Sequence, residues 1–234
     1  MGVKDDMEEK KTGRSCDTML MERVFAMDDY QTAAPRLIVR LLSACRTNVP
    51  GQGYRRIGDI AMVLYLILDE CEGHLVSMRV SARQFRKWNR QEEDLFQTAM
   101  NNTILRDPPR LYRLETLLSG ENQEGQAFMD KADPFCLSSG VCGDCLTTER
   151  KLNGAVAAFY PGVAKRLSEI MGSDFFLAFT SMHEVMLHPL ESASPEVLKE
   201  ILEETIHEAT GAEDFLSYGI FRYFREDDTI RQVL

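Results

Sequence analysis

The chain has 234 residues, an apolar fraction of 44% and a net charge of −10. This is enough length and apolar content for one or two folded domains, and it excludes a wholly disordered chain. The charge is uneven, because residues 1–120 carry +1 and residues 121–234 carry −11. An acidic surface repels phosphate backbones, so we do not expect the C-terminal half to bind nucleic acid.

Two features predict a cytoplasmic location. Residues 1–14 are a charged tail without the apolar centre of a signal peptide. The longest apolar run is Ile60–Leu68, whereas a membrane-spanning helix needs about 20 residues. We therefore expect a soluble cytoplasmic protein that does not associate with membranes.

Residues 15–118 are predicted to form an N-terminal α+β half. Ile60–Leu68 is rich in branched side chains and predicts a central strand buried on both faces, with a buried helix as the alternative. Residues 75–80 predict its neighbouring strand. Apolar side chains three and four residues apart predict helices, at residues 20–27, at 35–45 after Pro35, at 82–89 after the N-cap Ser81, and from Gln91 to the Pro108-Pro109 pair.

Residues 119–144 are predicted to be a polar linker or loop, and residues 145–234 a C-terminal α+β half that could pack with the first as one domain. Strands are predicted at residues 145–148, 154–159, 175–179, 185–190 and 218–224, followed by a charged tail. Asn153-Gly154 predicts a tight turn that joins the first two of these strands as a hairpin. Helices are predicted after Pro161 and after Ser194-Pro195. The predicted class is α+β, with an antiparallel or mixed sheet covered by amphipathic helices.

The order of these segments resembles an uncharacterised domain-of-unknown-function family that is common in gut Clostridia. The resemblance covers about residues 25–225 and is carried by Pro35-Arg36-Leu37-Ile38, Asp59-Ile60-Ala61-Met62-Val63, the segment Trp88–Thr103, and Asn153-Gly154-Ala155 through Pro189. It implies an intracellular α+β protein and no substrate, cofactor or catalytic residue. Family members are longer at the N-terminus, so the resemblance implies a short version, and residues 136–145 depart from the pattern by adding cysteines.

Cys142-Gly143-Asp144-Cys145 is a CxxC pair with Cys136 six residues before it. Three thiolates are one ligand short of a structural zinc site, so zinc binding needs a distant fourth ligand such as His74 or His183. Redox chemistry is the second interpretation and incidental loop thiols the third. The expected cofactor is none, with zinc as the alternative.

The turn Ser181–Glu184 is the predicted rim of any pocket. His183-Glu184 resembles the start of a metalloprotease HExxH motif, but Leu187 stands where the second histidine is required. Ser181, His183 and Glu184 are therefore weak catalytic candidates, and stabilisation of the turn by Ser181 and His183 is the competing interpretation.

Four arginines recur at spacings of four, three and four, which on one helix makes a basic stripe. They are Arg79, Arg83, Arg86 and Arg90. Such a stripe suits RNA, DNA or an acidic partner, while a solvated or ion-paired surface is the alternative.

The sequence contains no phosphate loop and no nucleophile elbow. We expect a non-enzymatic interaction or regulatory protein whose partner is another protein. A metal-binding protein or enzyme near the Ser181–Glu184 turn and the Cys136–Cys145 loop is the alternative. Nucleic-acid binding through the arginines is a third. The sequence defines no oligomeric state.

Overall fold

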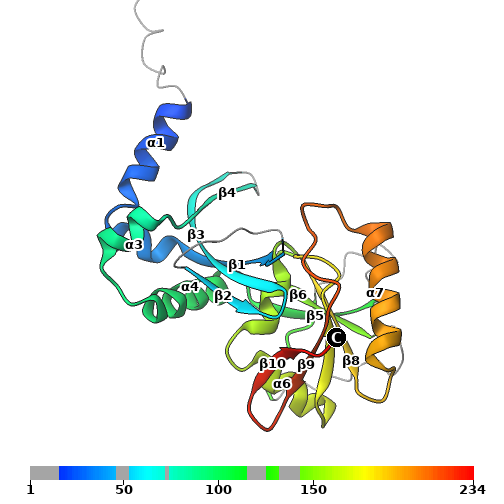
Figure 1. Cartoon of the computed structure of the whole chain (residues 1–234). Coiled ribbons are helices and arrows are strands. Elements are labelled where there is room, and N and C mark those ends of the chain that lie inside the picture. Colours follow the sequence, from blue (N-terminus) through cyan, green and yellow to red (C-terminus); the bar gives the residue numbers. More distant parts are fainter. Residues whose placement is uncertain (1–15, 46–52, 72–73, 115–124, 132–142) are drawn as a thin grey trace, which may run out of the picture.

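Two β-sheets with helices around them form the computed structural model, which describes residues 16–45, 53–71, 74–114, 125–131 and 143–234 (Figure 1). The strand pairs within these residues are antiparallel. Helices and antiparallel sheets together confirm the predicted α+β class.

The first sheet is built around one long strand. Its members are β1 (Leu37–Ser43), β2 (Tyr54–Ile57), β3 (Ile60–Cys71) and β4 (His74–Arg79). β3 pairs with all three of the others. Between residues 60 and 68 every side chain except Tyr65 is buried. The prediction of a central strand here, with residues 75–80 beside it, is confirmed.

The helix that was predicted after Pro35 is wrong, because most of this segment forms the strand β1. Only Ala34–Arg36 is helical, as the short 3₁₀ helix η1, and the strand starts at Leu37. Four of the seven β1 residues are apolar and buried, and they lie on both faces of the strand, so the apolar run matched a helical spacing by coincidence. Pairing with the equally apolar β3 decided the outcome, because a strand buried on both faces needs a neighbour of the same kind.

The described residues form four further N-terminal helices, and all but the second of them were predicted. They are α1 (Cys16–Ala26), the short α2 (Tyr30–Ala33), α3 (Ala82–Trp88) and α4 (Glu92–Arg106). α4 packs on β1 through buried side chains such as Leu95 and Ala99. α1 projects from the body at one end of the molecule (Figure 1).

The second sheet has the strand order β10-β9-β7-β8-β6-β5. Its strands are β5 (Pro109–Arg113), β6 (Asp144–Thr148), β7 (Phe175–Ala178), β8 (Val185–Pro189), β9 (Ile220–Phe224) and β10 (Thr229–Gln232). Two of these strands, β5 and β10, were not predicted. At β5 the Pro108-Pro109 pair was interpreted only as the end of a helix, yet proline can also begin an edge strand. β10 was predicted to be a charged tail, but its half-exposed residues pair with β9 at the other edge.

Gly154–Phe159 is a 3₁₀ helix, η2, so the predicted hairpin is wrong. Asn153 does adopt the left-handed conformation, with φ of 55°, but the chain then packs against β6 as a helix. Five of the six η2 residues are buried, and three of these five are alanine. A Cβ at Gly154 would collide with the Thr147 hydroxyl, so glycine permits this close approach.

Alternate side chains of the second sheet face two different layers. Phe175 and Leu177 enter the main core, whereas Phe176 and Ala178 face α7 (Pro195–Ala209). The main core also takes in η2 and α6 (Val163–Met171), together with residues of both sheets. The two predicted halves therefore share one apolar core. The boundary at residues 119–144 stays a prediction.

Within the described residues no helix combines the length and the apolar character needed to cross a membrane.

Candidate functional site

A cavity of about 420 Å³ lies where the first sheet meets the loop after β6 and η2. We call it the intersheet cavity, and it is lined by Ile38, Val39, Arg40, Glu70, Leu75, Thr103, Arg106, Asp107, Arg150, Leu152, Asn153, Val156 and Tyr160. Its volume falls in the range of small-molecule sites, and an apolar wall with a few converging polar groups is typical of them.

Arg40 is the most informative residue of the intersheet cavity. It interrupts the apolar run of β1 and is half-buried. Its Nε and Nη2 atoms donate to Asn153 Oδ1 at 3.2 and 2.9 Å, Nη1 donates to Ser77 Oγ at 3.2 Å, and the guanidinium stacks 5.0 Å above the Tyr65 ring. In the described part of the chain no carboxylate forms an ion pair with Arg40. A half-buried cation with neutral partners is a natural anion-binding group.

Two further arginines share a single carboxylate at the mouth of the intersheet cavity. Arg150 Nη1 lies 2.6 Å from Glu70 Oε1, and Arg106 binds the other oxygen of Glu70. Hydrogen bonds from Arg150 and Arg106 hold the pKa of Glu70 below its usual value, so this carboxylate is ionised. Two guanidinium groups for one carboxylate leave a positive excess at this side of the cavity.

The other polar groups of the lining are tied to the protein. Thr103 Oγ1 donates to the Ala99 carbonyl at 2.6 Å, and the Tyr160 hydroxyl donates to the Asp107 carbonyl at 3.2 Å. The Asp107 carboxylate accepts from the Thr148 hydroxyl at 2.7 Å and from the Arg150 N–H at 3.0 Å. Burial raises the pKa of Asp107 above its ordinary value.

The intersheet cavity therefore combines three arginines and two carboxyl groups with an aliphatic wall. Its net charge is positive even when Asp107 is ionised, in a chain whose overall charge is −10. Guanidinium groups recognise carboxylates and phosphates through paired hydrogen bonds. The arrangement suits a small molecule with an anionic head and an apolar body. The described residues contain no group of three histidine, cysteine or acidic side chains placed to hold a metal ion.

The predicted pocket rim, Ser181–Glu184, lies directly behind this cavity. His183 Nδ1 accepts from the Asn153 N–H at 3.0 Å, and His183 Nε2 lies 3.1 Å from Asp214 Oδ1. Ser181 Oγ accepts from the His183 N–H at 3.0 Å. Both ring nitrogens of His183 are thus engaged, so His183 holds Asn153, which in turn holds Arg40. This geometry favours the turn-stabilising interpretation of Ser181 and His183, and their catalytic role stays a prediction.

The cysteine loop is described only in part, because Cys136 and Cys142 lie outside the described residues. Cys145 is buried on β6, and its thiol lies 3.9 Å from Glu184 Oε2. Burial, with the nearby Glu184 carboxylate, raises the pKa of the Cys145 thiol well above its ordinary value. A buried, protonated thiol is a poor nucleophile. Zinc binding stays a prediction.

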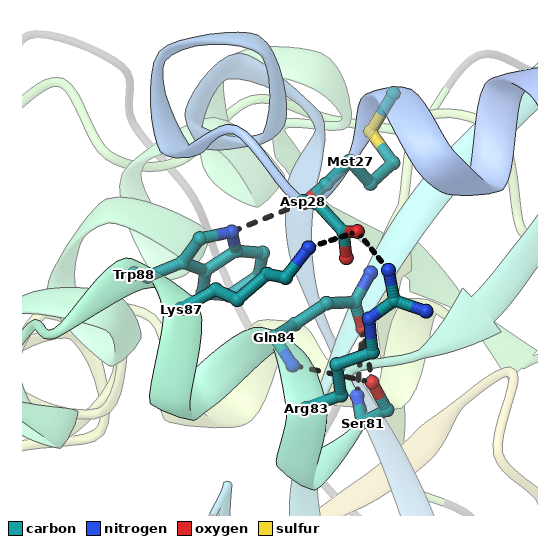
Figure 2. Close-up of polar contacts among 7 residues, drawn as sticks. All are labelled: Met27, Asp28, Ser81, Arg83, Gln84, Lys87 and Trp88. Carbon is teal, nitrogen blue, oxygen red and sulfur yellow. Dashed lines mark hydrogen bonds and ion pairs between the residues drawn. The ribbon is translucent and has the colours of Figure 1, made fainter.

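The four arginines of the predicted stripe do not lie on one helix. Arg79 ends β4, Arg83 and Arg86 lie on α3, and Arg90 follows that helix. Figure 2 shows that Arg83 and Lys87 both bind the Asp28 carboxylate, at 2.5 and 2.6 Å, and that Trp88 Nε1 donates to the Met27 carbonyl at 3.0 Å. Arg90 stacks 4.9 Å above Tyr30. Arg83, Lys87 and Arg90 therefore bind residues 28–30, which follow α1, and so link α3 to that segment.

Sequence reasoning missed the residues that line the intersheet cavity. Arg40 was assigned to a predicted helix. Had residues 37–43 been predicted as a strand, a single arginine among apolar residues would have been noticeable. Arg106, Arg150 and Glu70 come from three separated segments, and no local spacing connects them. Asn153 was noted for its turn, but its bond to Arg40 spans 113 residues.

Comparison with known proteins gives a family and no function. No curated protein and no solved structure matches the chain. One family model matches residues 9–225, which is most of the chain. The chain therefore belongs to DUF5688, a family of unknown function.

Proposed function

We propose that this protein is a non-enzymatic regulatory protein of the cytoplasm that binds a small anionic molecule in the intersheet cavity. The ligand has a carboxylate or phosphate head for the arginines and a short apolar body for the aliphatic wall. The observation that carries the proposal is Arg40, a half-buried guanidinium whose described partners are an amide, a hydroxyl and a ring. An anion there gains charge-assisted hydrogen bonds at a site that is already partly removed from water.

Binding without catalysis is supported by the two hydroxyl groups of the cavity lining, whose protons are both used in hydrogen bonds. The Thr103 and Tyr160 hydroxyls both donate to backbone carbonyls, and burial raises the pKa of Tyr160. Neither is poised as a nucleophile or a base. The cytoplasmic location is supported by Cys45 and Cys145, which are free thiols of the kind that a reducing compartment preserves.

Phenyl phosphate and benzoate are suitable probes, and benzamide is the matched neutral control. We expect both anions to bind, measured by calorimetry and by the shift in melting temperature, and benzamide to bind far more weakly. Arg40→Met keeps the aliphatic stem and removes the charge. It should weaken anion binding about tenfold to hundredfold, since a hydrogen bond to a charged group contributes about 1.5–3 kcal/mol.

A second variant separates loss of binding from loss of folding. Leu152→Trp places a large ring at the half-exposed edge of the intersheet cavity without touching an arginine, and it should also block the probes. Arg231→Gln removes a surface charge far from the cavity and should leave binding unchanged. Anion binding that survives both Arg40→Met and Leu152→Trp would show that the cavity is not the site.

A further inference from the structure

α1 presents apolar side chains to solvent at one end of the molecule. Leu20, Met21 and Phe25 are 37%, 52% and 53% exposed, and the spacing of four between Met21 and Phe25 places them on one side of the helix. Large apolar side chains gathered on a projecting helix are typical of a docking surface.

Cations of α3 and the loop after it border these apolar side chains. Arg83 lies 5.5 Å from the Phe25 ring, and Arg86 and Arg90 are exposed. Among the described side chains of this region, the cations Arg83, Arg86, Lys87 and Arg90 outnumber the acidic Glu22, Asp28 and Asp29, so the region carries a small net positive charge. Figure 2 shows Arg83 and Lys87 beside Asp28. We call the exposed side chains of α1 together with these cations the α1–α3 face.

α7 has the opposite character. Its buried stripe of Leu198, Leu202 and Ile206 packs on the second sheet. Its outer surface exposes Val197 and Ile201, at 45% and 41%, one helical turn apart. The acidic residues around them are Glu196, Glu200, Glu203, Glu204 and Glu208, against one lysine, Lys199. We call this surface the α7 face.

We propose that the α1–α3 face of one copy binds the α7 face of a second copy. Each face has a small exposed apolar centre, and the net charges around the two centres are opposite in sign, so the surfaces are complementary in both respects. The faces lie on different elements at opposite ends of the molecule (Figure 1). The contact is therefore head-to-tail, and it produces rings or open chains rather than a closed twofold dimer.

Charge explains why self-association is selective. Two α7 faces repel each other because both are strongly acidic, whereas the net positive α1–α3 face attracts an α7 face, which leaves the unlike pair as the favoured contact. Each side offers little more than a single helix, so the interface is small and the complex is weak. Assembly depends on protein concentration and falls as salt screens the charges.

Two matched variants test the proposal by sedimentation velocity on the full chain. Phe25→Ser with Arg86→Glu disables the α1–α3 face, and Ile201→Ser with Glu204→Lys disables the α7 face. All four residues are exposed, so circular dichroism should show intact folding. The wild type should form species larger than a dimer at low salt, and each variant alone should be monomeric.

The mixture of the two variants is the decisive sample. One variant keeps a working α7 face and the other keeps a working α1–α3 face, so an equimolar mixture should stop at a one-to-one dimer. A wild type that stays monomeric at every concentration overturns the proposal, even if it binds anionic lipid vesicles through Phe25. A mixture that stays monomeric, or an α7 variant that assembles like the wild type, overturns it as well.

Discussion

At the scale of single residues, Asp107 links the intersheet cavity to stability. Because burial raises its pKa above the ordinary 3.8, the folded state binds a proton more readily than the unfolded state does. The contribution of Asp107 to stability therefore falls as pH rises from about 3.8 through the raised pKa. Asp107→Asn removes this titration and keeps an oxygen for the Arg150 N–H. We expect the unfolding free energy of Asp107→Asn, relative to wild type, to increase over that pH window in urea titrations.

The control for this prediction is Asp107→Ala. Alanine leaves the Thr148 hydroxyl and the Arg150 N–H without their acceptor, which should cost about 1–3 kcal/mol at neutral pH. An asparagine variant as unstable as the alanine variant would show that the carboxylate, rather than its hydrogen bonds, stabilises this corner.

At the scale of elements, α3 depends on its first turn. Ser81 Oγ accepts from the Gln84 N–H, and Gln84 Oε1 accepts from the Ser81 N–H at 2.8 Å, which is a capping box. Ser81→Ala should lower the unfolding free energy by about 1 kcal/mol, since it removes the hydroxyl that accepts the hydrogen bond from the Gln84 N–H. Ser81→Asp restores an acceptor and should recover most of the loss in denaturant melts. Equal losses in both variants would contradict the capping role.

Elements with a local cause were predictable from sequence, and elements decided by distant contacts were not. The Ser81 cap and the Ser194-Pro195 start of α7 each depend on neighbouring residues, and the structure has both. β1 depends on β3, and β10 depends on β9, so neither could be identified from its own residues. The intersheet cavity could not be predicted for the same reason, because Arg40, Arg106 and Arg150 come together only in the folded chain.

At the scale of the whole molecule, the shared core predicts a single unfolding step. β5 lies in the predicted N-terminal half but pairs with β6 of the other half, and one buried cluster joins Leu64 of β3 to Phe179 and Tyr160. Calorimetry of the ligand-free monomer should give a calorimetric enthalpy equal to the van't Hoff enthalpy. Two resolved transitions would mean that the halves are independent domains.

A fragment comprising residues 143–234 is the matching control. It lacks β5 and the apolar surface of the first sheet, so it should show no cooperative transition. A fragment that melts as sharply as the full chain would support the predicted boundary at residues 119–144.

The bond between Arg40 and Asn153 also has a consequence for how the protein is made. The two residues are 113 positions apart, and a loop of that length must close before the contact can stabilise anything. The first sheet leaves the ribosome well before Asn153 is synthesised, so a partly made chain has Arg40 but no cavity wall to hold it. An anion in the intersheet cavity would thus select finished molecules over nascent ones.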